Sequence, residues 1–189
     1  MILLATLKRE GLSNTQTLSE FLADKMGGER IDAEIVRLAA HTILPGTYSD
    51  MGDDDEWPSI LTKIMDADII VFATPIWWNN MSSLMQRVVE RLDDLHDHVM
   101  KGEASGLEGK AAGIVITGDS DGAQSVIACL ANFFNAVGLR LPPFATLSVL
   151  WDKQAKGKDT PREELIAKYE KDYATTAGKM IASLKAAVG

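Results

Sequence analysis

The chain has 189 residues and a formal net charge of -8, and its 46% hydrophobic and 24% charged residues are typical of a globular protein with a sizeable core. The negative charge disfavours nucleic acid or an anionic membrane as a partner, and the single cysteine, Cys129, excludes an intrachain disulfide and a thiolate metal cluster. The apolar run Ile2 to Leu7 is too short for a signal peptide or a membrane span, so we expect a cytoplasmic protein.

Five apolar segments of strand length alternate with segments of helical periodicity. The expected strands cover residues 2–7, 33–39, 67–75, 111–118 and 144–151. The expected helices cover residues 13–26, a short segment after Trp57-Pro58, residues 82–100, residues 122–137 and a C-terminal segment from Thr160-Pro161 onward. Continuous apolar strands joined by helices indicate a parallel sheet covered on both faces, so we expect residues 1–189 to form one three-layer α/β domain.

Several short motifs predict where elements end. Gly27-Gly28 is expected to stop the first helix, and Pro75 is expected to end the third strand. Thr160-Pro161-Arg162-Glu163 has the pattern of a capping box that starts the last helix. Pro142 and Pro143 place the last strand at a sheet edge, because proline cannot donate to a central ladder.

Three other features have plain structural interpretations. The acidic run at 53–56 is expected to be a solvated turn at a helix start, and Cys129 a small core residue beside Leu130. His96, Asp97 and His98 resemble a metal cluster, but residues two apart on a helix point away from each other. We therefore expect no metal site there.

Ligands of open parallel sheets bind beyond the carboxyl ends of the strands, where the strand order reverses, so the loops after strands one, three and four are the candidate site. The first loop, Thr6 to Gln16, carries positive charge at Lys8 and Arg9. Its donors Ser13, Asn14 and Thr15 stand at a helix N-terminus, which favours a phosphate. The alternative is plain helix capping by Ser13 and Gln16. The loop contains neither a P-loop nor a dinucleotide fingerprint.

The second loop, "ATPIWWNN" at residues 73–80, places two tryptophans between a buried strand and a helix start. On an extended backbone Trp77 and Trp78 point in different directions, so one could pack on the domain while the other covers a flat ligand. Asn79 and the backbone amides could bind the edge of a heterocycle. The alternative is a subunit interface, where tryptophan is also enriched.

The third loop, "TGDSDGAQ" at residues 117–124, has glycines at 118 and 122 that permit tight turns and close approach of a ligand to the backbone. Asp119 and Asp121 disfavour a phosphate here and suit a turn and a helix cap. Together the three loops describe a site with phosphate donors at one end, aromatic cover in the middle and a glycine-bearing wall. That layout fits a flat, phosphorylated ring system.

On these motifs the chain resembles the flavodoxin-like NAD(P)H-dependent FMN reductases and their iron–sulfur flavoprotein and quinone reductase relatives. The strongest part is "DADIIVFATPIWWNNMSSLMQRVVERLDDL", and "SNT" at 13–15 and "TGDSDGAQ" match the family's phosphate and ring-side loops. The resemblance implies a flavodoxin-like three-layer sandwich with a five-stranded parallel sheet in the order 2-1-3-4-5. The connection at 41–57 lacks the cysteine cluster of the iron–sulfur members, so no such cluster is expected.

The resemblance also implies which residues hold FMN. The phosphate would be held by Ser13, Asn14 and Thr15, with Lys8 or Arg9 nearby. The remaining residues would line the ring system: Pro75, Ile76, Trp77, Trp78 and Asn79 on one side, and Thr117, Gly118, Asp119 and Gly122 on its pyrimidine side.

The implied activity passes a hydride from NAD(P)H to FMN and then electrons to a quinone, another flavin or a similar small acceptor, so no catalytic triad is needed. The implied assembly is a homodimer or homotetramer. Two alternatives remain: a flavodoxin-type electron carrier without its own NAD(P)H turnover, and a flavodoxin-like protein that binds no flavin and acts through protein contacts.

Overall fold

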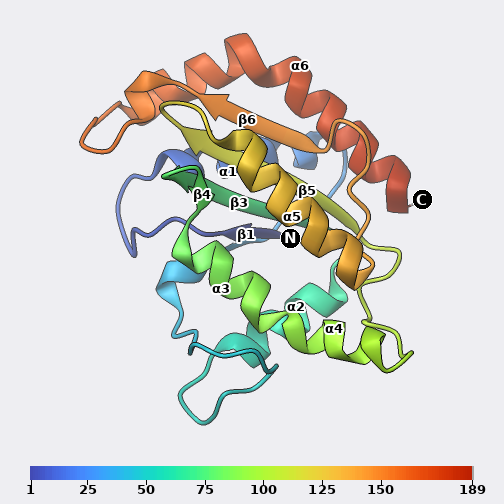
Figure 1. The fold of residues 1–189 in the computed structure, drawn as a ribbon. Coiled ribbons are helices and arrows are strands. Elements are labelled where there is room, and N and C mark those ends of the chain that lie inside the picture. Colours follow the sequence, from blue (N-terminus) through green and yellow to red (C-terminus); the bar gives the residue numbers. More distant parts are fainter. Residues whose placement is uncertain (189) are drawn as a thin grey trace.

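The computed structural model describes residues 1–188, and its centre is a mainly parallel β-sheet (Figure 1). Five parallel strands lie in the order β2-β1-β3-β5-β6, which confirms the predicted order when the parallel strands alone are counted. Their bounds are β1 (Ile2–Leu4), β2 (Ile35–Arg37), β3 (Ile69–Trp77), β5 (Ala111–Gly118) and β6 (Thr146–Leu150). A sixth, two-residue strand, β4 (Asn80–Met81), pairs antiparallel with the end of β3.

Helices cover both faces of the sheet (Figure 1). The helices are α1 (Asn14–Gly28), α2 (Trp57–Asp66), α3 (Ser83–Arg91), α4 (Asp93–Met100), α5 (Ala123–Val137) and α6 (Arg162–Val188), with short 3₁₀ helices η1 (Leu38–Ala40) and η2 (Asp152–Gln154). One apolar cluster lies between the sheet and helices α1 and α6. A second lies between the opposite face of the sheet and helices α2, α3, α4 and α5. Alternate residues of β3 supply the two clusters, as the pleat requires: Phe72 enters one and Val71 the other. No described helix is long and apolar enough to cross a membrane.

Pro75 does not end the third strand, contrary to the prediction. β3 continues to Trp77, and Pro75 stays in register with Thr117 of β5. The pairing of β1 with β3 stops at Ala73, so the other edge of β3 is free of β1 at Pro75. A proline without an N–H is tolerated at such an edge.

The predicted helix over 82–100 is two helices that meet at Leu92. The N–H of Leu95 donates to the carbonyl of Leu92 over 3.1 Å, which tightens the backbone at the junction. Asp93 and Asp94 occupy the first turn of α4, where negative charge favours a new helix start. The continuous apolar stripe therefore concealed a break.

Two predicted helix ends also differ. Gly27 and Gly28 lie inside α1, and the left-handed residue that follows the helix is Arg30, with φ 62°. Helix α6 begins at Arg162, while the Thr160 hydroxyl donates to the carbonyl of Lys153 over 2.7 Å. That hydroxyl thus fastens the loop before the helix.

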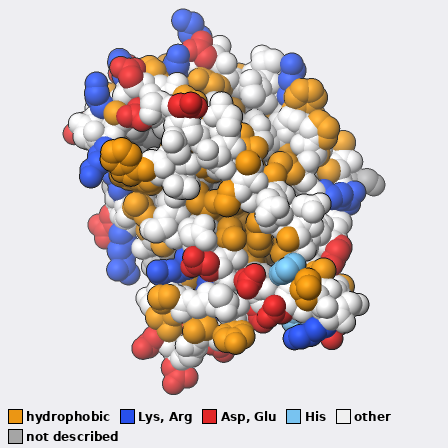
Figure 2. All heavy atoms as spheres, viewed as in Figure 1, with side chains coloured by type: hydrophobic (Ala, Val, Ile, Leu, Met, Phe, Trp, Pro, Cys, Tyr) orange, Lys and Arg blue, Asp and Glu red, His pale blue; other side chains and the backbone are white. Residues whose placement is uncertain are grey.

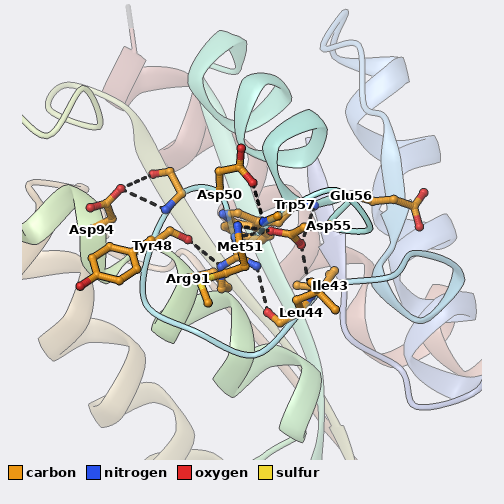
Figure 3. A network of polar contacts seen from close by, with 12 residues as sticks. Ile43, Leu44, Tyr48, Asp50, Met51, Asp55, Glu56, Trp57, Arg91 and Asp94 are labelled. Carbon is orange, nitrogen blue, oxygen red and sulfur yellow. Dashed lines mark hydrogen bonds and ion pairs between the residues drawn. The ribbon is translucent and has the colours of Figure 1, made fainter.

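Two expectations about burial are wrong. Cys129 is exposed, because it lies one position from Leu130 and so about 100° around α5 from the buried face. Asp55, expected in a solvated acidic turn, has a fully buried carboxylate that pairs with the equally buried guanidinium of Arg91 over 2.6 Å. Figure 3 shows this network, in which Arg91 also donates to the carbonyls of Leu44 and Tyr48 and so anchors the connection between β2 and α2.

Candidate functional site

The carboxyl ends of β1, β3 and β5 lie side by side, and the three loops predicted to form the site leave from them (Figure 1). The first two are tied together below the surface. The Ser82 hydroxyl, at the start of α3, donates to the carbonyl of Ala5 over 2.7 Å, and Thr74 Oγ1 accepts from the Ser82 N–H over 3.0 Å. The ends of β1 and β3 therefore form one unit.

The first loop ends in the capped N-terminus of α1. Ser13 is the N-cap: its buried hydroxyl accepts from the Gln16 N–H over 3.4 Å and donates to Thr6 Oγ1 over 2.9 Å. The capping interpretation of Ser13 is thus confirmed. Capping leaves the first backbone N–H groups of α1, at Asn14 and Thr15, aligned at the positive end of the helix dipole.

Two basic side chains brace this loop by hydrogen bonds to its backbone carbonyls. Lys8 Nζ donates to the carbonyl of Leu12 over 2.7 Å, so this amine closes its own loop. Arg37, at the end of β2, donates to the carbonyls of Lys8 and Gly11 over 3.0 and 3.2 Å. Sequence reasoning missed Arg37, because β2 is not one of the strands whose loops were considered. A hollow of about 260 Å³ lies beside this loop and the first turns of α1.

The second loop is a tight β-hairpin between β3 and β4. Its two turn residues, Trp78 and Asn79, both have left-handed backbones, with φ 49° and 63°. Such a pair forms the two-residue turn that matches strand twist, although a bulky tryptophan rarely occupies it. The Trp78 side chain is 93% exposed, whereas Trp77 is half-buried. The two tryptophans thus differ in exposure, but a left-handed turn at Trp78, and not the extended backbone that was predicted, separates them.

Trp77 faces a segment that was not among the predicted loops. The Lys156 ammonium lies 5.7 Å from the centroid of the Trp77 ring. The indole N–H of Trp77 is buried and has no hydrogen-bond partner within residues 1–188. A buried donor without a partner costs free energy, so this N–H is a group that a ligand acceptor could satisfy.

The third loop contacts both of the others. The hydroxyls of Thr117 and Thr15 are both buried and lie 2.7 Å apart, which joins the end of β5 to the start of α1. Gly122 has φ 119°, and a Cβ there would lie 2.9 Å from the Cα of Asn79. This glycine therefore permits the close approach of the third loop to the hairpin.

The remaining predicted residues of this wall differ in accessibility. Gly118 closes β5, where a Cβ would meet the Ile76 side chain at 3.0 Å. Asp119 is exposed and accepts from the Ser120 hydroxyl over 3.1 Å. Asp121 accepts from the Gly122 N–H over 2.8 Å, in agreement with its expected role in a turn. The acidic side chains are thus used locally.

A fourth segment, residues 151–160, completes the wall and was missed from the sequence. It follows the edge strand β6 and contains η2. Its one buried polar side chain among residues 151–159, that of Gln154, bonds to the end of β5 and to helix α6, and the backbone carbonyl of Gln154 accepts from Asn14 at the end of the first loop. A single glutamine in a lysine-rich stretch gives no periodic or motif signal, so sequence reasoning had no means to select it.

Of the three residues that resemble a metal cluster, His96, Asp97 and His98, the last contacts a neighbouring carboxylate. His98 Nδ1 lies 2.7 Å from a carboxylate oxygen of Glu103. Among the described residues, no group of three or more His, Cys, Asp or Glu side chains is placed to hold a metal ion.

Comparison with known proteins identifies what this arrangement is similar to. The family model described as NADPH-dependent FMN reductase matches residues 2–155. The 8-demethyl-8-aminoriboflavin-5'-phosphate synthase of Streptomyces davaonensis is 33% identical over 155 residues, which cover 77% of this chain and 60% of that protein. A protein described as divalent metal cation transporter MntH, from Mycobacterium bovis, is 33% identical over 146 residues, which cover 75% of this chain and only 21% of that protein. The chain thus spans less than two thirds of both curated relatives.

Solved structures show the same fold. The crystal structure of RosB with a bound intermediate, 8-demethyl-8-formylriboflavin-5'-phosphate, matches with a TM-score of 0.80 at 28% identity, covering 99% of this chain and 77% of that one. A flavodoxin from Streptococcus pneumonia TIGR4 matches with a TM-score of 0.57 at 19% identity, covering 98% and 96%. The latter likeness shows the flavodoxin-like fold alone.

Proposed function

The chain belongs to the NADPH-dependent FMN reductase family, and we propose that it is an FMN-binding oxidoreductase that takes electrons from NAD(P)H and passes them to a small-molecule acceptor such as a quinone or another flavin. The observation that carries the proposal is the convergence of the three predicted loops. Thr15 contacts Thr117, and Asn79 contacts Gly122, at the carboxyl ends of adjacent strands. In folds of this kind that edge is where ligands bind.

The residues present fit a phosphorylated flavin. The start of α1 offers backbone N–H groups at Asn14 and Thr15, which suit the phosphate. We propose that Ser13 and Lys8 hold the loop around that phosphate, since both side chains bond within the loop. Asn14 is half-buried and the Thr15 hydroxyl is buried against Thr117, so backbone groups are the better phosphate donors.

The hairpin and the third loop would hold the ring system. The orphaned indole N–H of Trp77 and the open face of Trp78 lie on one side, with Pro75, Ile76 and Asn79 beside them. Gly118, Asp119 and Gly122 would border the ring from the third loop, which packs directly on the hairpin at Ile76 and Asn79, with Thr117 buried beneath it.

FMN, when bound, supplies the hydride and electron chemistry. The chain's own residues would bind and orient it, and the hairpin would control the access of substrates to the ring. No acid–base residue is required, because the flavin itself would accept the hydride.

A second candidate function follows from one comparison. RosB, at 28% identity and a TM-score of 0.80, is described with a bound flavin intermediate. The relative of this chain from Streptomyces davaonensis is named as a synthase of an aminoriboflavin phosphate. FMN could therefore be the substrate of this chain instead of its cofactor. Chromatography of the flavin after turnover separates the two, because a cofactor is recovered unchanged.

We also propose a homodimer. Figure 2 shows hydrophobic side chains gathered over α3, α4 and α5, where several apolar residues remain partly exposed. Trp78 and Met100 are exposed at 93% and 73%. Large exposed apolar patches mark association surfaces, and light scattering on the purified protein measures the mass directly.

The test of the proposed function is a visible spectrum of the protein after addition of FMN and removal of the excess, repeated after anaerobic NADH or NADPH. A retained flavin band that bleaches supports the reductase. A retained band that NAD(P)H cannot bleach points to an electron carrier, and the absence of a retained band contradicts both.

A further inference from the structure

Gln154 makes a set of hydrogen bonds that no other residue of segment 151–160 makes. The side chain is buried in η2, beyond the end of β6. Its amide nitrogen donates to the carbonyl of Val149 over 2.8 Å and to that of Gly118 over 3.3 Å. Its side-chain oxygen accepts from the Tyr169 hydroxyl of α6 over 2.9 Å. Both ends of the amide are therefore used, and only an amide of this length can donate and accept in these directions.

The backbone of Gln154 reaches the opposite loop. Its carbonyl accepts from the side-chain amide of Asn14 over 3.2 Å, at the first residue of α1. The chain Asn14–Gln154–Gly118 therefore connects the proposed phosphate end of the site to the start of the ring-side loop. The direct contact of Thr15 with Thr117 runs parallel to it.

These contacts also fix the carbonyl of Gly118. That oxygen accepts from the Trp151 N–H over 2.9 Å as well as from Gln154. A carbonyl that accepts two hydrogen bonds cannot turn without the loss of both, so the peptide that leads into Asp119 is held in one orientation. The backbone of the ring-side loop is thus set from residues outside it.

We propose that Gln154 is a positioning residue for flavin binding: it holds the phosphate loop at Asn14 and the ring-side loop at Gly118 in register with each other. The inference rests on the proposed function, because it concerns the same site. Gln154 itself touches no part of the proposed ligand and acts through Asn14 and Gly118.

The decisive variant is Gln154→Glu, which keeps the size of the side chain and the acceptor for Tyr169. A carboxylate has no proton to donate, so it would face two carbonyl oxygens and break both bonds to Val149 and Gly118. We expect the Kd for FMN to rise about tenfold, the change that one lost buried hydrogen bond produces.

The ratio of the Kd for riboflavin to the Kd for FMN is the readout that a merely structural role would not move. Once the side chain loses its bonds to Val149 and Gly118, the backbone carbonyl of residue 154 that holds Asn14 is expected to shift as well. The phosphate end then weakens in addition to the ring end, so this ratio is expected to fall by about threefold. Tyr169→Phe removes one donor to Gln154 and should raise the Kd for FMN in the same direction by a smaller factor. Ile64→Val is the control: it lowers the melting temperature from a buried position in α2, remote from the loops, and should leave both Kd values unchanged.

The outcomes separate this inference from the proposed function. Wild-type protein that binds no FMN overturns both. Wild-type protein that binds FMN, with a folded Gln154→Glu variant that has the same Kd values, overturns the role of Gln154 alone. If that variant does not fold, Tyr169→Phe decides the matter, and unchanged FMN affinity in it overturns the inference.

Discussion

The buried pair Asp55–Arg91 should dominate the change in the free energy of unfolding with pH in the acid range. It should also supply much of the local stability of the connection between β2 and α2. Its guanidinium makes three hydrogen bonds, to the Asp55 carboxylate and to the carbonyls of Leu44 and Tyr48, and lies 5.6 Å from the Trp57 ring (Figure 3). Arg91→Met keeps an apolar stem but leaves the Asp55 carboxylate buried without a counter-charge. The pair lies at the far end of α3 from the hairpin, so the variant tests stability and not the site.

The expected loss of stability can be worked out from the burial of the pair and from the pKa of Asp55. Removing one partner of a buried ion pair costs about 3–5 kcal/mol, because the remaining charge stays desolvated. Burial alone would raise the pKa of the Asp55 carboxyl, but the hydrogen bond from Arg91 and the N–H donors of Leu44, Trp57 and Met51 outweigh it and lower the pKa to about 2. That lowering from 3.8 corresponds to about 2 kcal/mol of stability.

The sign of the pH effect is fixed by the direction of the pKa change. Because the pKa is lower in the folded state than in the unfolded chain, the contribution is complete above about pH 4 and is lost as the pH falls towards 2. The wild-type free energy of unfolding should therefore fall through this window. Asp55→Asn, which cannot ionise, should show a smaller fall there.

Urea denaturation at pH 7 and between pH 4 and pH 2 measures both effects. Asp54→Asn is the matched control, since Asp54 is the adjacent aspartate but is exposed. A cost of less than about 1 kcal/mol for Arg91→Met, the value of a surface pair, would contradict the large contribution expected of this buried pair. So would an Asp55→Asn variant whose free energy of unfolding falls as steeply below pH 4 as that of the wild type.

Three further predictions concern the site. Thr15→Val leaves the buried Thr117 hydroxyl without its partner and should cost about 1–3 kcal/mol in urea denaturation, while Thr15→Val/Thr117→Val should cost less than the two single changes added together. Gly122→Ala should lower both the melting temperature and FMN retention, because its Cβ would lie 2.9 Å from the Asn79 backbone. The control is Gly102→Ala, at a residue with φ 80° where a Cβ would have nothing within 4 Å. Equal losses in the two variants would contradict the steric explanation. Trp78→Asn should raise stability by about 1 kcal/mol, because asparagine tolerates a left-handed backbone, yet slow the bleaching of bound FMN by NAD(P)H; a loss of stability would show that the exposed indole packs on this chain.

The central sheet could be predicted from the sequence because its strands are continuous apolar runs. The segment 111–118 was located to the residue, and α5 is flanked by Gly122 and Gly138, both of which have left-handed backbones. The strand order came from the resemblance to a known family, since periodicity alone does not order strands. Apolar runs and flanking glycines were therefore reliable predictors for elements that are buried along their whole length.

The errors share a physical cause, which is that long-range contacts overrule local signals. Pro75 continues a strand because β1 has already ended beside it, a fact of pairing that the sequence does not display. Asp55 lies in an acidic run, but its burial depends on Arg91, 36 residues away. Arg37 and Gln154 likewise brace the candidate site from elements that no loop motif selects.

The hairpin at the centre of the site is better understood as a rigid element than as a loose loop. β3 pairs through Pro75 with β5 and through Trp77 with β4, so only two residues are left for the turn. Both take left-handed backbones, at a cost of order 1 kcal/mol or more each. The paired strands, the close packing of Asn79 on Gly122 and the buried hydroxyl of Ser82 stabilise the turn against that cost. The exposure of Trp78 is therefore imposed by the backbone, and a surface held in place before a ligand arrives loses little entropy on binding.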